Sequence, residues 1–176
     1  MQLYRANFYN FGPACEGEPL LYGAQAPEWR MPQSWVSFMK ENGVKRVCCL
    51  LTADEIHNFY TKPPLKELYL AEFGKENILW AGITNDSLCS REALDKLIIP
   101  FLRKSIKDDG KTVVHCRAGS GRTSVILAAF LVRVRNMDID EALKAVSNVA
   151  GVSRRLLDGV GKDYTRTDLV SLLKIV

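Results

Sequence analysis

Short apolar runs bounded by turn residues recur through the first two thirds of the chain. Their length and their flanking Gly, Pro and Asp residues are typical of buried β-strands. The clearest runs are residues 20–24, 44–51, 77–83 and 111–116, and a less regular run near 2–8 indicates an earlier strand. The pattern therefore predicts a sheet of about five strands.

Helical periodicity separates these runs and takes over the end of the chain. Pro32 and Gly43 mark the two ends of one helix, and Ser90 precedes a longer helical stretch that Pro100 should kink. Further helices are expected at about 122–135, after the capping-box residues Asp138 and Glu141, and at about 163–175.

Strands that alternate with helices, followed by a helical carboxy-terminal third, predict an α/β domain. The expected architecture is a central mixed, mainly parallel sheet with helices on both faces. We expect one domain over residues 1–176, because no repeat or low-complexity linker divides the chain. Ligands of such sheets bind beyond the carboxyl ends of the strands, so the segment after 111–116 becomes the first candidate site.

The composition is that of an ordinary globular protein, with 47% hydrophobic and 25% charged residues. A net charge of +4 favours anionic ligands but is too small to indicate nucleic-acid binding. The longest apolar run, 125–132, is much shorter than the roughly 20 residues that cross a bilayer, so we expect no membrane span. Five cysteines without disulfide or metal-ligand spacing, and an amino terminus without a secretory signal, predict a cytoplasmic protein. We expect a monomer without a cofactor. We also expect no metal, since His57 and His115 are the only histidines and a His-rich metal site is hard to assemble from them.

Residues 115–124, with the sequence HCRAGSGRTS, join the run at 111–116 to a helix. Their backbone amides can converge on one point at the helix amino terminus, where the helix dipole favours an anion. Gly119 and Gly121 permit unusual dihedral angles and keep side chains away from incoming oxygens. The segment therefore predicts a phosphate-binding loop lined by Arg117, Ala118, Gly119, Ser120, Gly121 and Arg122.

Four side chains in or beside this loop have expected roles. Arg122 offers a planar guanidinium fork that matches two phosphate oxygens. Cys116 lies in the field of the loop amides, the helix terminus and Arg122, all of which favour its thiolate and make it a candidate nucleophile. Thr123 can donate its hydroxyl to the sulfur, and His115 is expected to hydrogen-bond the surrounding backbone rather than act as a base. The alternative is a buried structural cysteine beside an ordinary turn.

HCRAGSGRT resembles the signature of the protein tyrosine phosphatase superfamily, which is His-Cys, five residues, Arg, then Ser or Thr. YGAQAP, a following helix and GVKRVCCLL resemble the amino-terminal half of compact dual-specificity phosphatases, and the resemblance covers roughly residues 18–160. It implies a protein tyrosine phosphatase-like fold. The longer tyrosine-specific enzymes carry a tyrosine-bearing loop that deepens the pocket, and no such segment is visible here, which implies a shallower pocket.

Such an enzyme needs a carboxylic acid that protonates the leaving oxygen. Asp86 follows the run at 77–83 and precedes Cys116 by 30 residues, a separation similar to that of the family. TNDS also resembles the Asn-Asp loop of several dual-specificity members. We therefore expect Asp86 to be the general acid, with a simple turn residue as the alternative. The remaining candidates are poorly placed, in a helix or in the turn before the cysteine-bearing strand: Asp95, Asp108 and Asp109.

Together these residues predict a metal-independent cysteine phosphatase that works through a phosphocysteine. Its expected substrates are phosphorylated proteins, with phosphotyrosine first and phosphoserine and phosphothreonine as well. Arg117 keeps a phosphoinositide or other small phosphate ester as an alternative, which Ser120 weakens because phosphatases of that kind usually carry a second basic residue there. A binding module that reads phosphorylated partners without turnover is a third possibility.

Two weaker patterns lie outside the loop. Arg154 and Arg155 are expected to form a solvated charged turn, with a position beside the pocket as the alternative. Cys48 and Cys49 face opposite sides of a strand and are expected to pack as small core residues. Reversible bonding of Cys49 to the nucleophile, as in some relatives, is the alternative, and Cys89 also stays open as a redox partner.

Overall fold

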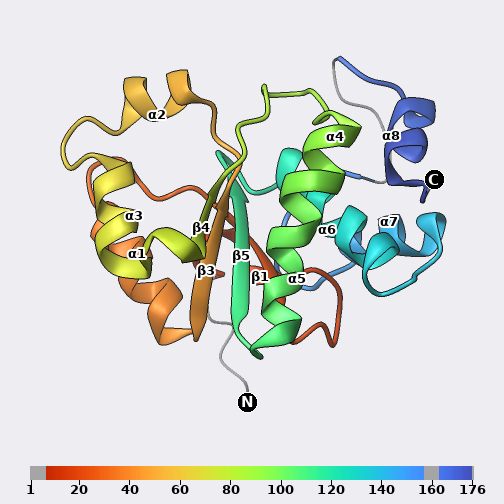
Figure 1. The fold of residues 1–176 in the computed structure, drawn as a ribbon, viewed down its shortest axis with the longest axis horizontal. Coiled ribbons are helices and arrows are strands. Elements are labelled where there is room, and N and C mark those ends of the chain that lie inside the picture. The colour runs from red at the N-terminus through yellow and green to blue at the C-terminus, as the bar shows by residue number, and fades with distance from the viewer. Residues whose placement is uncertain (1–6, 157–162, 176) are drawn as a thin grey trace.

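The computed structural model describes residues 7–156 and 163–175 (Figure 1). Within these ranges the strands form one sheet in the order β1-β2-β5-β3-β4. β1 pairs antiparallel with β2, and all other pairs are parallel, so the predicted mixed, mainly parallel sheet is confirmed. The strands are Gly12–Pro13 (β1), Leu21–Gln25 (β2), Val44–Cys49 (β3), Ile78–Trp80 (β4) and Lys111–Cys116 (β5).

β5 lies at the centre of the sheet, between β2 and β3. Val113 and Val114 are fully buried there, as expected for a parallel strand that is covered on both faces. Cys116 pairs with Gln25 of β2, and His115 pairs with Cys49 of β3. Three neighbouring strands therefore end at nearly the same level, and their following loops start side by side.

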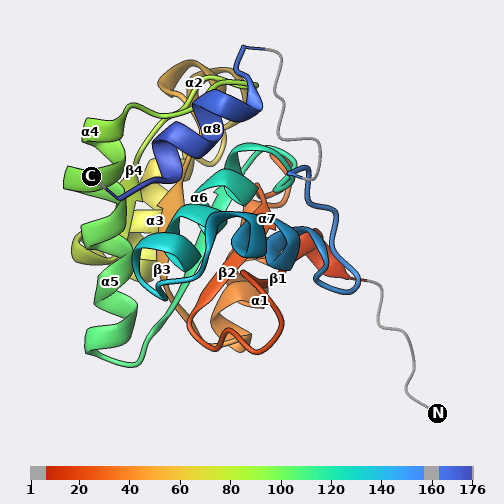
Figure 2. The same cartoon turned by 90° about the vertical axis from the view of Figure 1, so that its right-hand side faces the viewer.

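Helices cover both faces of the sheet, as predicted (Figures 1 and 2). α1 and α3 pack on one face, where Trp35, Met39 and Tyr69 form the centre of one apolar cluster. α5 and α6 lie on the other face, and α7 and α8 pack against α6. The helices are α1 (Pro32–Glu41), α2 (Ala53–Phe59), α3 (Leu65–Phe73), α4 (Arg91–Ala93), α5 (Ile99–Lys107), α6 (Arg122–Arg133), α7 (Ile139–Ser147) and α8 (Arg166–Leu173).

α6 is the most deeply buried helix of the second layer. All its residues from Arg122 to Val132 are buried, because the sheet lies on one side and α7 and α8 lie on the other. This explains why the sequence is apolar around the whole helix rather than along one stripe. None of the described helices is long and apolar enough to cross a membrane.

Several predicted elements have different boundaries in the structure. The helical stretch after Ser90 contains a π-helical turn, Leu94–Ile98, which ends two residues before Pro100, a residue that has no amide hydrogen to donate. The run at 77–83 is a strand only over Ile78–Trp80, and its remainder leads into a loop. The strand expected near 2–8 lies mostly outside the described residues, and Phe8–Asn10 is a 3₁₀ turn.

Candidate active site

The carboxyl ends of the parallel strands bring three segments to one edge of the sheet. β5 ends at Cys116 and continues through residues 117–121 into α6, β3 leads to α2, and β4 leads to a loop over residues 81–90. Figure 1 shows α2 and the 81–90 loop at the end of the sheet toward which β5 runs. In the 81–90 loop, the carbonyl of Ile83 accepts a hydrogen bond of 2.7 Å from Nη1 of Arg122. Because Arg122 is the first residue of α6, this bond joins the 81–90 loop to the end of the 117–121 loop.

The backbone carbonyls of the 117–121 loop all accept hydrogen bonds from groups outside it. The amide of Ala26 donates to the carbonyl of Arg117, and the amide of Arg155 donates to that of Ser120, each over 3.0 Å. Because a trans peptide points its C=O and N–H in opposite directions, carbonyls that are held outward turn the next amides inward. The loop therefore has the arrangement expected of an anion cradle. The remaining acceptors are the carbonyls of Ala118, Gly119 and Gly121.

Glycine is required at one of the two loop positions that the sequence singled out. Gly119 has a φ of +72°, and a Cβ there would lie only 2.4 Å from the carbonyl carbon of Ala24. Gly121 has a φ of −92°, and a Cβ there would meet nothing within 4 Å. The expectation that glycine is needed for an unusual backbone conformation is thus correct for Gly119 and wrong for Gly121. At Gly121 the absence of a side chain only leaves open space.

Cys116 lies at the base of the loop and is 3% exposed. The hydroxyl of Thr123 donates to its sulfur over 3.1 Å, as expected. His115 is fully buried, with Nδ1 3.3 Å from the backbone carbonyl of Cys116 and Nε2 3.0 Å from the hydroxyl of Tyr69. Burial lowers the pKa of His115 to about 4, so its ring is neutral at pH 7. The imidazole is suited to hold the loop in shape, and Tyr69 is a support that the sequence reasoning missed.

Arg122 is held by a carboxylate that the sequence reasoning did not identify. Its Nη1 and Nη2 donate to the two carboxylate oxygens of Glu55 over 2.7 and 2.8 Å. Burial disfavours the charged forms of both groups, but their mutual hydrogen bonds outweigh it, so the pKa of Glu55 is lowered and that of Arg122 is raised. The pair is therefore ionised at neutral pH, and it fixes the plane of the guanidinium.

The position of Glu55 follows from the start of α2. The hydroxyl of Thr52 accepts a hydrogen bond from the amide of Glu55, and the Glu55 carboxylate accepts one from the amide of Thr52, which together form a capping box. The sequence signal that could have found it is Thr-Ala-Asp-Glu directly after the buried β3 run. That pattern predicts a helix start at the same sheet edge as Cys116.

Asp86 occupies the tip of the 81–90 loop. Its φ is +62°, a left-handed conformation that Asp tolerates better than most residues. The amide of Ser87 closes the turn on the carbonyl of Thr84 over 3.1 Å, and the Asn85 side chain donates to the Asp86 carboxylate. The amide of Asp163, ahead of α8, donates to the carbonyl of Asp86 over 3.3 Å. Asp86 thus lies in a turn, as expected if it were a simple turn residue. The same loop is joined to Arg122 through the carbonyl of Ile83.

Arg117 and Ser120 differ in exposure. Arg117 is exposed, and its guanidinium lies 4.3 Å from the centre of the Phe59 ring in a cation–π contact at the rim of the loop. Ser120 is buried, and within residues 7–156 and 163–175 its hydroxyl has no hydrogen-bond partner. The rim of the loop therefore carries a long basic side chain stacked on an aromatic ring, and the interior of the loop carries a hydroxyl.

Residues 77–156 match the family model described as "Dual specificity phosphatase, catalytic domain", and this span contains both Asp86 and the whole 117–121 loop. This part of the chain is therefore similar to the catalytic domain of dual-specificity phosphatases. Dual specificity protein phosphatase 16 of Homo sapiens is 36% identical over 64 residues, which are 35% of this chain and 10% of that protein. The chain thus spans only a small part of this relative's length. The family resemblance stated from the sequence is confirmed, and the chain contains a phosphatase domain.

Solved structures of related phosphatases have the same fold as this phosphatase domain. Kinase associated phosphatase with its catalytic-site cysteine substituted by serine has a TM-score of 0.68 at 18% identity, over 86% of this chain and 83% of that one. PTPMT1 in complex with PI(5)P has a TM-score of 0.65 at 19% identity, over 93% and 92%. The PTP-2 phosphatase of Cydia pomonella has a TM-score of 0.64 at 18% identity, over 94% and 89%. At these identities the likeness establishes the fold alone.

The expected solvated turn is wrong for Arg154 of this phosphatase domain. Its side chain is buried, and Nη1 donates to the carbonyl of Gly119 over 2.9 Å. The side chain of its neighbour Arg155 is exposed, and only its backbone amide contacts the loop, at Ser120. Charge patterning could not separate the two residues, because the direction of each side chain depends on how the segment after α7 packs on β2.

The cysteines of β3 are fully buried in the core. Burial raises the pKa of Cys49 to about 12, and it raises that of Cys48 further. Burial also raises the pKa of Cys89 to about 11. These three thiols are therefore protonated at neutral pH, as expected of cysteines that serve as small apolar residues.

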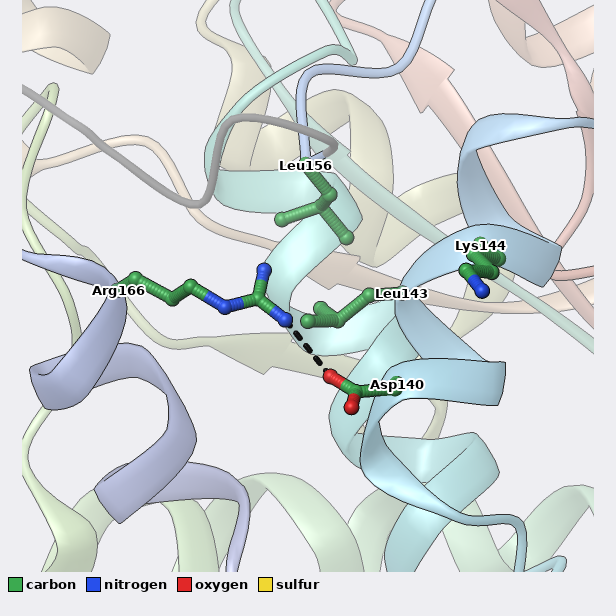
Figure 3. Close-up of a pocket in the computed structure, with 5 residues that line it drawn as sticks. All are labelled: Asp140, Leu143, Lys144, Leu156 and Arg166. Carbon is green, nitrogen blue, oxygen red and sulfur yellow. Dashed lines mark hydrogen bonds and ion pairs between the residues drawn. The ribbon is translucent and has the colours of Figure 1, made fainter.

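A cavity of about 350 Å³ lies between α7 and α8 (Figure 3). Leu143 and Leu156 form its apolar lining, and Lys144 lies on its α7 side. The guanidinium of Arg166 points into it but donates to the Asp140 carboxylate over 2.7 Å. Since that cation is already paired, we assign the cavity no anion-binding role.

Proposed function

We propose that this chain is a single catalytic domain that hydrolyses phosphomonoesters without a metal ion, through a phosphocysteine at Cys116. The observation that carries the proposal is the loop over residues 117–121 between Cys116 and Arg122, whose carbonyls all accept hydrogen bonds from groups outside it, which favours amides that face a bound anion. The preferred substrate class is phosphotyrosine in proteins, with phosphoserine and phosphothreonine as further substrates. The preference rests on the family of the domain and on the absence, in the sequence, of a segment resembling the pocket-deepening loop.

In the first step, the Cys116 thiolate attacks phosphorus opposite the leaving oxygen, so that an S–P bond forms as the P–O bond breaks. Asp86 gives its proton to the leaving oxygen. The loop amides and Arg122 bind the three equatorial oxygens, on which negative charge is spread in the transition state. Since Glu55 holds one side of the Arg122 guanidinium, Nε–H and the outer Nη2–H form the edge that can meet two of these oxygens.

In the second step, water hydrolyses the phosphocysteine. Asp86, now ionised, takes a proton from the water as its oxygen attacks phosphorus, and the S–P bond breaks. The sulfur departs as a thiolate, which the Thr123 hydroxyl stabilises through the hydrogen bond of 3.1 Å. Phosphate leaves, and the enzyme returns to its starting protonation state.

The test is hydrolysis of p-nitrophenyl phosphate and of a phosphotyrosine peptide by the purified chain in EDTA. We expect turnover that vanadate blocks and that Cys116→Ser abolishes, whereas the matched variant Cys89→Ser keeps it. Acid quenching in the pre-steady state should trap a phosphorylated protein in wild type. Undiminished activity in Cys116→Ser would rule out the mechanism, and tight phosphopeptide binding without turnover in wild type would favour a binding module instead.

A phosphoinositide is the second candidate substrate. Arg117 favours it, because this exposed cation directly follows Cys116 and can reach a neighbouring phosphate of an inositol ring. The same fold in PTPMT1 has been solved with PI(5)P bound. Phosphate release from phosphotyrosine peptides and from phosphoinositides in mixed micelles should be compared for wild type and Arg117→Ala. A loss confined to the lipid in Arg117→Ala would support this candidate, and a clear peptide preference in wild type would remove it.

A further inference from the structure

Two distant segments supply the donors that hold the middle of the phosphate-binding loop from behind. The side-chain amide of Asn10 donates to the carbonyls of Ala118 and Gly119 over 3.2 and 3.3 Å. Nη1 of Arg154 donates to the same Gly119 carbonyl over 2.9 Å. The most glycine-rich part of the loop is therefore fixed by side chains that lie far away in the sequence.

Arg154 and Asn10 also hold each other. Nη1 of Arg154 reaches the backbone carbonyl of Asn10, and Nη2 reaches that of Gly12, both over 3.3 Å. The Asn10 side chain exchanges two hydrogen bonds with the backbone of Ser153, over 2.7 and 3.0 Å. The two residues thus form one rigid unit on the outer side of the loop, which we call the brace.

β2 leaves space for the Arg154 guanidinium by having a glycine. A Cβ on Gly23 would lie 2.8 Å from Nη2 of Arg154 and 2.8 Å from the Thr123 side chain. Gly23 has no positive φ that would require glycine there, so the reason for it is space. A Cβ there would also lie 2.9 Å from the Leu127 side chain, so Gly23 leaves room for the guanidinium together with the α6 side chains beside it.

The brace also places a positive charge near the sulfur. Burial lowers the pKa of Arg154 to about 10, against the opposing effect of Cys116, so the side chain is protonated at neutral pH. Within the described ranges Arg154 makes no ion pair, whereas Arg122 is paired with Glu55. Near the loop, Arg122 is charged and paired with Glu55, Arg154 is charged, Arg117 lies exposed at the rim, and burial keeps His115 neutral at pH 7.

We propose that Arg154 is a positioning residue for the oxyanion site. With Asn10 it holds the carbonyls of Ala118 and Gly119 outward, and it thereby keeps the following two amides, those of Gly119 and Ser120, directed at the bound anion. Its charge acts through the polarised peptides on the same anion and on the thiolate. This proposal rests on the proposed function only in that the loop is taken to bind a phosphate-like anion.

The experiment measures anion binding and cysteine reactivity, neither of which needs turnover. Tungstate affinity is measured by calorimetry, and the pH midpoint of Cys116 alkylation by iodoacetamide is followed by mass spectrometry. Arg154→Met should weaken tungstate binding by about tenfold, the scale of one lost charge-assisted hydrogen bond, and should move the alkylation midpoint to higher pH. Arg154→Lys should recover part of both effects, because one ammonium can still reach the Gly119 carbonyl.

Arg155→Met is the matched control, since it removes an exposed cation of the same segment and leaves the backbone contact to Ser120 in place. It should stay within about twofold of wild type. A folded Arg154→Met with wild-type tungstate affinity and alkylation midpoint would overturn the proposal, because the arginine would then serve stability alone. If Arg154→Met does not fold, Asn10→Ala decides, with the same expected losses and the same refuting result. A wild-type chain that binds tungstate but hydrolyses no phosphomonoester would refute the proposed function while leaving the brace testable.

Discussion

Glu55→Gln tests whether the carboxylate behind Arg122 positions it for phosphate. Glutamine keeps the size of the side chain and one acceptor oxygen, but it loses the charge and one of the two contacts of 2.7 and 2.8 Å to the guanidinium. The side chains of Arg122 and Glu55 are only 3% and 18% exposed, so water compensates poorly for the lost contact. Arg122 remains charged and keeps its bonds to the carbonyls of Ile83 and Leu50.

The expected cost follows from these contacts. Removing one partner of a buried ion pair typically costs about 3 to 5 kcal/mol, and a single hydrogen bond to a charged group contributes about 1.5 to 3 kcal/mol. Because glutamine retains one acceptor, we expect Glu55→Gln to lower the free energy of unfolding by about 2 to 3 kcal/mol at pH 7. A guanidinium no longer fixed in its plane should lower kcat/KM by roughly 10- to 100-fold.

The pH dependence of the same variant separates charge from shape. Burial acts to raise the pKa of Glu55, but hydrogen bonds from Arg122 and Thr52 outweigh it, so its pKa in the folded state lies below the unfolded value. The stabilisation is therefore present above about pH 4.3, the usual pKa of glutamate, and is lost as the pH falls through the lower folded pKa. The stability difference between wild type and Glu55→Gln should shrink there.

Urea denaturation from pH 7 to pH 3, with circular dichroism as the signal, measures this difference. Glu72→Gln is the control, since Glu72 forms an ion pair of 2.9 Å with Lys40 on the surface, where the side chains are 28% and 50% exposed. It should change stability much less than Glu55→Gln and leave kcat/KM unaltered. An equal effect of the two variants at pH 7, or a Glu55→Gln deficit that stays constant down to pH 3, would refute the reasoning.

Three further predictions concern the loop and its surroundings. Asp86→Asn should lower kcat by about 10² to 10⁴ for alkyl phosphates and less for p-nitrophenyl phosphate, whose leaving group needs little protonation; equal losses with both substrates would argue against a general acid. Gly119→Ala should lower the melting temperature and abolish tungstate binding because of its φ of +72° and the 2.4 Å contact, whereas Gly121→Ala should retain the melting temperature; similar melting temperatures for the two variants would contradict this. Burial lowers the pKa of His115 to about 4, whereas the usual pKa of histidine is about 6.5. Between these two pH values the imidazole is protonated in the unfolded chain but neutral in the folded chain, so the free energy of unfolding should fall as the pH decreases. Denaturation at pH 7 and pH 5 should show a steeper loss in wild type than in His115→Asn, and parallel curves would contradict it.

Local patterns in the sequence were enough to predict most of the fold. The run at 111–116 is β5 over the same residues, and Pro32, Ser90 and Asp138 stand at the helix starts that they predicted. Each of these signals depends on neighbouring residues, through burial of a short run or through a cap. Boundaries were less accurate where packing decides, as in the run at 77–83, of which only three residues pair with β3.

The site divides in the same way. The sequence by itself determined the phosphate-binding loop, because HCRAGSGRT places the thiol, the glycines and the arginine within a single strand-to-helix turn. Only the tertiary structure revealed what holds that turn. Glu55 and Tyr69 reach Arg122 and His115 from α2 and α3, and Arg154 reaches Gly119 from beyond α7. These contacts join residues 35 to 67 positions apart, where no local periodicity or spacing links the partners, so they exist only once the sheet has set the strands in register.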